Sequence, residues 1–273
     1  MTTVSLSHGE TLWYKRTGTG VPILQIHGSA FGHRNFERLT PELTADFEII
    51  DFDLPGFGES TGDPRAGGLE GIADQVAEFI DILGVAPVHV HGTSFGAMVG
   101  MNLAAKYPSL LDRLVLSCFL ARYDSAARMM RATWKLAARD SGMAAVADLT
   151  AVAGFARSFY DRDEAQAQLE SMRDAFRQTD PEAFVRGTQM LEATDLSPLA
   201  DRIMAPTLLL AGDEDNMTPF NPADSGVGFS KIQNAIPTCE TVVLPTCGHY
   251  LVLEKPKDTA ALIKGFLRRP ASS

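Results

Sequence analysis

The sequence predicts an α/β fold in which a mostly parallel sheet of about eight strands carries helices on both faces. Short apolar runs bounded by Gly, Pro and Asp alternate with helical stretches over most of the 273 residues. Such runs are typical of parallel strands, because helices bury both faces of a parallel sheet. The length fits one large α/β unit with an insertion.

Six apolar runs are the candidate strands of the parallel part of the sheet. They are residues 21–28, 47–56, 87–92, 112–119, 205–212 and 239–245. Two earlier runs, TVSLS and TLWYKRTG, are joined by His8, Gly9 and Glu10. This pattern predicts an antiparallel hairpin at the edge of the sheet.

Three helices are expected to cover these strands. The apolar residues of LEGIADQVAEFIDILG (69–84) recur with helical spacing, and Gly84 is placed to end that helix. FGAMVGMNLAAKYP (95–108) is almost wholly apolar or small, so we expect it to be buried against the sheet. The last helix is expected over 257–269.

The alternation stops between about residues 120 and 197. This segment is rich in Ala, Arg, Met and Glu, with helical spacing and no strand-like run. We expect a core domain of residues 1–119 and 198–273, with residues 120–197 as a helical cap, or lid. A long segment after Pro219, within 220–236, is interpreted as a gating loop.

Charge and cysteine content exclude several classes of function. Acidic residues outnumber basic ones by 34 to 24, which argues against nucleic acid as a partner because such binding needs concentrated positive charge. With no apolar run of roughly 18 residues and no secretory signal, a cytoplasmic protein without membrane contact is expected. Cys118, Cys239 and Cys247 form no C-x-x-C pair, and the histidines show no metal-binding spacing. We predict no metal and no cofactor.

HVHGTSFGAMVG, residues 89–100, contains a G-x-S-x-G pattern centred on Ser94. A strand is expected before this pattern and a helix after it, which would place Ser94 on a strained turn where flanking side chains would collide. The helix N-terminus would favour a developing negative charge. A polar residue in a glycine-rich bend is the alternative. His89 and His91 are interpreted as strand packing.

A serine nucleophile needs a base, and the base needs a third group to orient it. His249 follows the last expected strand and precedes the last helix, at the same edge of the sheet as Ser94. Asp215 lies just past the strand that ends at residue 212, but Asp213 and Glu214 are its competitors on position alone. The candidate nucleophile, acid and base thus occur along the chain in the order serine, acid, histidine.

Five segments together resemble the α/β-hydrolase superfamily over essentially the whole chain. They are QIHGSAFG, DFDLPGFGES, HGTSFGA, GDEDNMTP and GHYLVLEKP. The order of serine, acid and histidine also matches this fold, and the acid-turn segment favours Asp215. The resemblance implies an oxyanion hole made by the backbone N–H groups of Ser29 and Phe95. Asp53 and Glu254 also match family positions, and we interpret them as structural.

Within this superfamily the chain is most similar to enol-lactonase and cofactor-free haloperoxidase-like carboxylesterases. A serine at position 94 separates it from dehalogenases and epoxide hydrolases, which use an aspartate there. The expected function is cleavage of a small carboxylic ester or lactone through an acyl-enzyme, by a chain compatible with a homodimer. The alternatives are a carbon–carbon bond hydrolase of ring-cleavage products, a haloperoxidase or perhydrolase, and a small-ligand receptor with vestigial hydrolysis.

Two groups of side chains are candidates for the wall of the substrate pocket. The group beside the expected catalytic positions comprises Phe31, Met217 and Tyr250. The group in the expected cap comprises Met130 and Trp134, with Met129, Phe155, Phe159 and Tyr160 as further candidates. Core packing is the commoner role of Met and aromatic residues at helical spacing.

Overall fold

One sheet of eight strands organises the part of the chain that the computed structural model describes, residues 2–29, 31–63 and 67–269. The strands are β1 (Thr2–Ser5), β2 (Thr11–Thr17), β3 (Val21–Ile26), β4 (Phe47–Phe52), β5 (Val88–Thr93), β6 (Leu111–Ser117), β7 (Thr207–Gly212) and β8 (Cys239–Leu244). Their order across the sheet is β1-β2-β4-β3-β5-β6-β7-β8. Strand β2 pairs antiparallel with β1 and β4, and the other neighbours are parallel. The predicted fold class and edge hairpin are confirmed.

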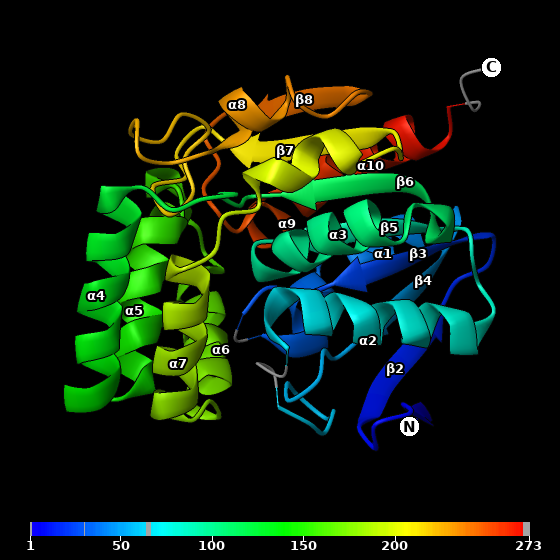
Figure 1. Cartoon of the computed structure of the whole chain (residues 1–273). Helices are drawn as coiled ribbons and strands as arrows, with labels where there is room; N and C mark the ends of the chain where they lie inside the picture. The colour runs from blue at the N-terminus through cyan, green and yellow to red at the C-terminus, as the bar shows by residue number, and fades with distance from the viewer. Residues whose placement is uncertain (1, 30, 64–66, 270–273) are drawn as a thin grey trace.

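Helices cover both faces of this sheet (Figure 1). Helices α2 (Gly68–Leu83) and α3 (Phe95–Lys106) lie on one face, and α1 (Thr40–Leu43), α9 (Leu251–Glu254) and α10 (Pro256–Leu267) lie on the other. Helix α3 is buried from Phe95 to Ala105, as its small and apolar residues predict. The structure also contains short 3-10 helices: η1 (Gly32–Phe36), η2 (Pro108–Leu110), η3 (Arg157–Asp161) and η4 (Ser197–Arg202).

Side chains on the two faces of the sheet pack into two separate apolar cores. On β3, Leu24 and Ile26 pack into the core beneath α2 and α3, whereas Ile23 packs into the core beneath α10. This alternation follows from the two-residue period of a strand, in which successive side chains point to opposite faces. The continuous apolar runs of the sequence therefore reflect burial on both sides.

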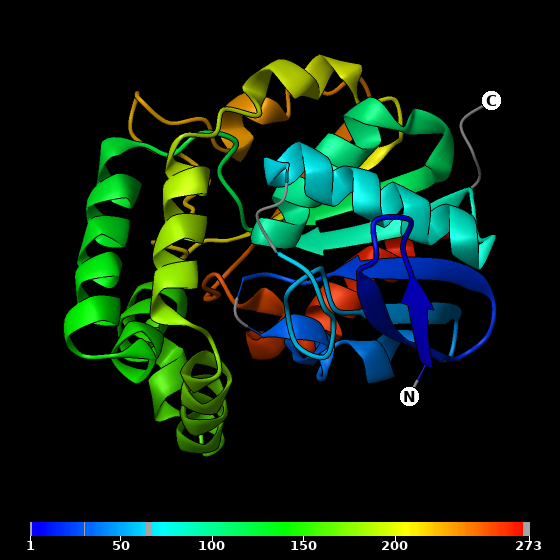
Figure 2. The same ribbon diagram turned by 60° about the horizontal axis from the view of Figure 1, so that its bottom comes forward.

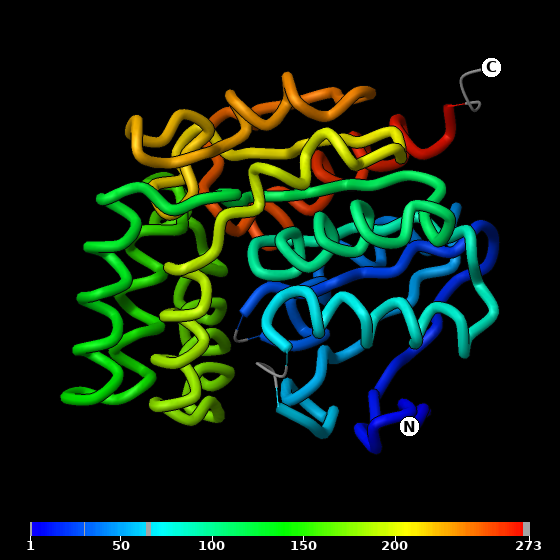
Figure 3. The backbone as a smooth tube through the Cα atoms, in the orientation of Figure 1, coloured from blue at the N-terminus to red at the C-terminus, as the bar shows by residue number. Residues whose placement is uncertain are grey.

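Four α-helices come between β6 and β7 in the sequence. They are α4 (Ser125–Asp140), α5 (Met143–Gly154), α6 (Ala165–Arg177) and α7 (Pro181–Glu192). They gather beside the carboxyl ends of the parallel strands (Figures 1 and 2), and the tube in Figure 3 shows the chain leaving β6 for α4 and returning from α7 towards β7. Asp124 and Asp180 cap α4 and α7 by accepting hydrogen bonds from the N–H groups of Ala127 and Ala183.

Segment 220–236, interpreted from the sequence as a gating loop, is packed against the start of the helical insertion. The Val227 N–H donates to the Arg122 carbonyl at 2.9 Å, and the Val227 carbonyl accepts from the Ala121 N–H at 2.8 Å. The Phe229 ring, in the short helix α8 (Phe229–Ile232), lies 5.2 Å from that of Phe119. These contacts anchor Val227 and Phe229 in the described structure, and a gating role for the segment stays a prediction of the sequence.

Among the described residues, no helix combines the length and the apolar character needed to cross a membrane.

Candidate active site

Ser94 occupies a sharp turn between β5 and α3. Its backbone has φ 54° and ψ −115°, a conformation that side chains rarely adopt. Its N–H donates to the Ser117 carbonyl at 2.8 Å. A Cβ at Gly92 would collide with the Gly96 carbonyl, and a Cβ at Gly96 would collide with that of Ile26. The two glycines therefore permit the turn that lifts Ser94 to the carboxyl edge of the sheet.

His249 links Ser94 to Asp215. The Ser94 Oγ lies 3.1 Å from His249 Nε2, and His249 Nδ1 lies 2.9 Å from Asp215 Oδ2. Both His249 and Asp215 are buried. With the Nδ1 proton directed at the carboxylate, Nε2 is left as the acceptor for the serine hydroxyl. The structure thus brings these three residues into one hydrogen-bonded line.

Asp215 is held by hydrogen bonds from its own turn. Its Oδ1 accepts from the N–H groups of Met217 at 2.8 Å and Thr218 at 2.9 Å, and its Oδ2 accepts from the Thr218 hydroxyl at 2.6 Å. Burial by itself raises the pKa of the Asp215 carboxyl, but the charge of His249 and the hydrogen bonds from His249 and Thr218 outweigh it and keep that pKa below its ordinary value. The carboxylate is therefore ionised in the folded protein.

The two neighbouring acids are used elsewhere. Asp213 Oδ1 accepts from the Cys247 N–H at 3.2 Å, and Glu214 Oε2 accepts from the Arg157 N–H at 2.8 Å. Of the three acids in this turn, Asp215 is the one that hydrogen-bonds to His249.

Glu254 supports the loop that carries His249. Its two carboxylate oxygens accept from the N–H groups of Gly248 at 3.0 Å and Ala156 at 3.1 Å. The His249 N–H donates to the Gly154 carbonyl at 2.5 Å. Burial raises the pKa of Glu254 to about 6. These contacts fix the position of the imidazole and agree with a structural role for Glu254.

The loop after β3 is fixed by a neutral histidine and an asparagine. His27 Nε2 accepts from the Leu54 N–H at 2.9 Å, so Nδ1 carries the proton and donates to the Gly28 carbonyl at 2.7 Å. Burial lowers the pKa of His27, which keeps the ring uncharged. Asn35 Oδ1 accepts from the Gly28 N–H at 2.7 Å. This holds the neighbouring Ser29 against the cavity that contains Ser94.

Asp53 organises the adjacent turn. Its Oδ1 accepts from the His33 N–H at 2.6 Å, and its Oδ2 accepts from the Glu59 N–H at 2.9 Å. Burial opposes ionisation, but the His33 and Glu59 hydrogen bonds outweigh it and lower the pKa of Asp53. Its partners agree with a structural interpretation.

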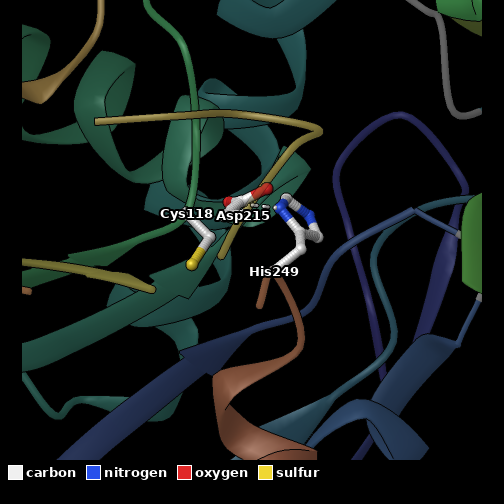
Figure 4. A group of neighbouring side chains, drawn as sticks. All are labelled: Cys118, Asp215 and His249. Carbon is white, nitrogen blue, oxygen red and sulfur yellow. Dashed lines mark hydrogen bonds and ion pairs between the residues drawn. The ribbon is translucent and has the colours of Figure 1, made fainter. Parts of the chain in front are cut away.

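Cys118 lies beside the acid and the histidine (Figure 4). Its Sγ, a carboxylate oxygen of Asp215 and a ring nitrogen of His249 all lie within 4.8 Å of one another, a spacing that a metal ion can use. Burial raises the pKa of the Cys118 thiol far above its ordinary value, so the thiol is protonated in the metal-free protein. Asp215 and His249 hydrogen-bond to each other, which is the arrangement that proton transfer needs.

Two neighbouring cavities lie at this end of the sheet, and Ser94 lines the smaller of them. The smaller has a volume of about 60 Å³ and is walled by Ser94, His249 and side chains from α4 to α7. The larger, of about 420 Å³, lies between α6, α7 and the loops at 31–34 and 56–59. The two cavities are adjacent, because six residues line both: Ser29, Phe31, Phe95, Phe184, Thr188 and Leu191.

Most of the predicted pocket residues line the smaller cavity. They are Phe31, Trp134, Met217 and Tyr250, together with the predicted oxyanion residues Ser29 and Phe95. Met130 does not line either cavity: it is half-buried and packs on an apolar core. Met130 lies outside the cavity wall because the buried face of α4 carries positions 127, 131, 134 and 138.

The further cap candidates do not line the cavities either. Met129 is 70% exposed and Tyr160 is 40% exposed. Phe155 and Phe159 are buried and stack on each other with ring centroids 3.9 Å apart. These residues are surface and core positions.

Sequence reasoning missed Thr218, Asn35 and Arg131. Thr218 follows Asp215 by three residues, the spacing at which a hydroxyl folds back on a nearby group. Arg131 falls on the helical spacing of the buried face of α4 and lines the smaller cavity. The helical spacing of Arg131 is visible in the sequence, but a charged side chain is normally expected on the exposed face of a helix.

Comparisons with known proteins agree with this architecture. A model of the alpha/beta hydrolase family matches residues 24–262. A pyrrolizixenacetamide deacetylase of Xenorhabdus hominickii is 27% identical, covering 92% of each chain. A malate-bound thermophilic esterase from Thermogutta terrifontis is 28% identical with a TM-score of 0.82, covering 97% of this chain and 96% of its own. The enol-lactonase from Burkholderia xenovorans LB400 has the same fold: TM-score 0.85 at 23% identity, covering 98% of this chain and 100% of its own.

Proposed function

Because the chain belongs to the alpha/beta hydrolase family, we propose that it is a serine hydrolase that cleaves a small carboxylic ester or lactone through an acyl-enzyme. The observation that carries this proposal is the hydrogen-bonded line from Ser94 through His249 to Asp215 at the wall of a cavity. Similarity to a deacetylase and an esterase supports a carbonyl substrate, because both names describe release of an acyl group.

The first step forms the acyl-enzyme. His249 Nε2 accepts the proton of the Ser94 hydroxyl while the serine oxygen attacks the carbonyl carbon, and the ionised Asp215 stabilises the imidazolium. The N–H groups of Phe95 and Ser29 stabilise the negative oxygen. Phe95 begins α3, and the first N–H groups of a helix have no acceptor within it. His249 then gives its proton to the departing alcohol oxygen.

The second step releases the acid. A water molecule loses a proton to His249 Nε2 and attacks the acyl carbon, and the tetrahedral intermediate collapses to return the proton to Ser94. The buried Asp215 keeps the imidazole in one tautomer through both steps.

We assign residues 120–197 to a cap over the site, and residues 1–119 and 198–273 to the catalytic core. The assignment rests on α4 to α7, which supply Arg131, Trp134, Thr150, Phe176 and Phe184 to the wall of the cavity that Ser94 also lines. Cytoplasmic location, the absence of a nucleic-acid partner and a homodimer stay predictions of the sequence.

Turnover of p-nitrophenyl acetate tests the proposed function. The substitution Ser94→Ala is expected to lower kcat by at least about 10⁴-fold. An unchanged circular dichroism spectrum is expected to show that the fold is intact. Ser141→Ala, at an exposed position that ends α4, is the matched control and is expected to retain activity. Undiminished turnover by the Ser94→Ala protein would contradict the assignment. Ligand binding with negligible turnover in the unaltered protein would favour a receptor.

A further inference from the structure

Arg131 is a buried cation in the wall of the smaller cavity. Its side chain comes from α4, which presents Ala127, Arg131, Trp134 and Ala138 on one buried face. The residue is only 6% exposed and lines the same cavity as Ser94 and His249. An arginine at a position that the helical pattern reserves for apolar side chains breaks a local rule, and such breaks concentrate at functional sites.

The guanidinium has few partners within the protein. Nη1 donates one long hydrogen bond, 3.4 Å, to the Ala127 carbonyl. The guanidinium carbon lies 3.7 Å from the ring centroid of Tyr123 and 5.2 Å from that of Trp134, which gives cation–π attraction. These contacts position the group but leave most of its five N–H donors unused.

No carboxylate of the described chain neutralises Arg131. Asp124, the acid at the start of the same helix, accepts hydrogen bonds from the N–H groups of Ala127 and Ala223 instead. Lys135, one turn further along α4, does have a partner, because it pairs with Glu192 at 2.7 Å. Within the described residues, the wall of the smaller cavity contains neither Asp nor Glu.

A buried cation without a counter-ion is costly, and a ligand anion would remove that cost. We propose that Arg131 binds a carboxylate of the substrate, so that the natural substrate is an ester or lactone that also carries a free carboxylate. The planar fork of arginine matches a carboxylate with two parallel hydrogen bonds. The inference rests on the proposed function, since it places the scissile carbonyl at Ser94 and the carboxylate at Arg131 across one cavity.

Two pairs of esters of matched shape test this specificity. Monomethyl adipate is compared with methyl hexanoate, which places the charge on the acyl side. The pair ω-acetoxypentanoate and pentyl acetate places it on the alcohol side. In at least one pair, kcat/KM for the charged ester is expected to exceed that of the neutral ester by about 10- to 100-fold, the range of one charged hydrogen-bonded contact.

Arg131→Gln is expected to reduce the ratio of charged to neutral kcat/KM by about 10-fold or more. Arg131→Lys, which keeps the charge but loses the fork, is expected to give an intermediate ratio. Arg128→Gln removes the same charge from an exposed position one turn earlier on α4 and is expected to keep the original ratio. A ratio that Arg131→Gln leaves unchanged would overturn the inference, as would a preference for both neutral esters.

A binding measurement separates this inference from the proposed function. In a Ser94→Ala background, monomethyl adipate and ω-acetoxypentanoate are expected to raise the thermal midpoint more than their neutral partners, and adding Arg131→Gln is expected to abolish that difference. Equal shifts with and without Arg131 would refute the carboxylate site. If Ser94-dependent hydrolysis of neutral esters persists in that case, the proposed function stands alone.

Discussion

Three residues around the site have backbone conformations that only glycine adopts easily. Ser94, Cys118 and Thr246 have φ values of 54°, 50° and 47°. Each follows the carboxyl end of a strand, β5, β6 or β8 respectively. Strain of this kind persists only where surrounding contacts enforce it, and it clusters at functional sites. Here one strained residue is the proposed nucleophile Ser94, and Cys118 lies beside Asp215 and His249.

The charge of Asp215 is testable by an isosteric change. Asp215→Asn keeps the size of the side chain but removes the negative charge that stabilises an imidazolium. We expect kcat for p-nitrophenyl acetate to fall by about 10⁴-fold. Glu214→Gln, a neighbouring acid bonded to Arg157, is the matched control and is expected to keep kcat within a few-fold. Equal losses in the two variants would contradict the role of Asp215.

The residues that sequence reasoning found are those tied to a local pattern. Ser94 stands between two glycines, and Asp215 and His249 follow strands in segments with a recognisable order. Asn35 could not be predicted in this way, because its role depends on η1 folding back on Gly28. No spacing in the sequence records such a tertiary contact.

At the scale of elements, the turn between β5 and α3 depends on the absence of side chains. Gly96→Ala would press a methyl group into the Ile26 carbonyl, which belongs to a buried strand and has no room to move. We expect the free energy of unfolding to fall by about 1–3 kcal/mol or more, together with activity. Urea denaturation of the purified variant measures the change.

Gly265→Ala provides the matched control for this substitution. Gly265 lies on the exposed side of α10, where an added Cβ meets nothing within 4 Å. Alanine is the better helix former, so stability is expected to rise by about 0.5–1 kcal/mol. If both alanines altered stability by the same amount and sign, the steric account of the turn would be wrong.

The long elements were predictable because burial imposes a period on them. Helices α2, α3 and α10 lie within two residues of their expected bounds, and the continuous apolar runs became parallel strands. The expected strand 47–56 ends earlier, at Phe52, because Asp53 begins the turn that binds His33 and Glu59. Short elements such as α1 and α8 were missed, since four residues carry no measurable period.

At the scale of the whole molecule, the sheet buries a carboxyl group that affects stability with pH. Asp51 on β4 is 8% exposed, and its oxygens accept from the Thr40 hydroxyl at 3.2 Å. Burial raises the pKa of Asp51 to about 6 despite that hydrogen bond. The folded protein therefore holds this proton more tightly than the unfolded chain does. Stability is lost as the pH rises from the unfolded pKa through the folded one.

Asp51→Asn should remove this dependence. The free energy of unfolding of the variant, relative to the unaltered protein, is expected to increase by about 2 kcal/mol between about pH 4 and about pH 7. A shift of roughly two pKa units corresponds to about 3 kcal/mol in total, and part of that loss lies below pH 4. Urea denaturation at a series of pH values measures the difference. Asp81→Asn, at an exposed position, is the control and should show a flat difference. A flat difference for Asp51→Asn would contradict the burial argument.

In the whole molecule, Ser94 lies at the carboxyl end of β5 and shares a cavity with side chains from α4 to α7. Its role as a nucleophile is the central claim. The most direct test is covalent labelling with a fluorophosphonate, whose phosphorus is attacked by an activated serine oxygen with loss of fluoride. Peptide mass spectrometry is expected to find one adduct per chain, on the peptide that contains Ser94, and none in the Ser94→Ala protein. An adduct on another residue, or ester turnover without any adduct at Ser94, would contradict the account.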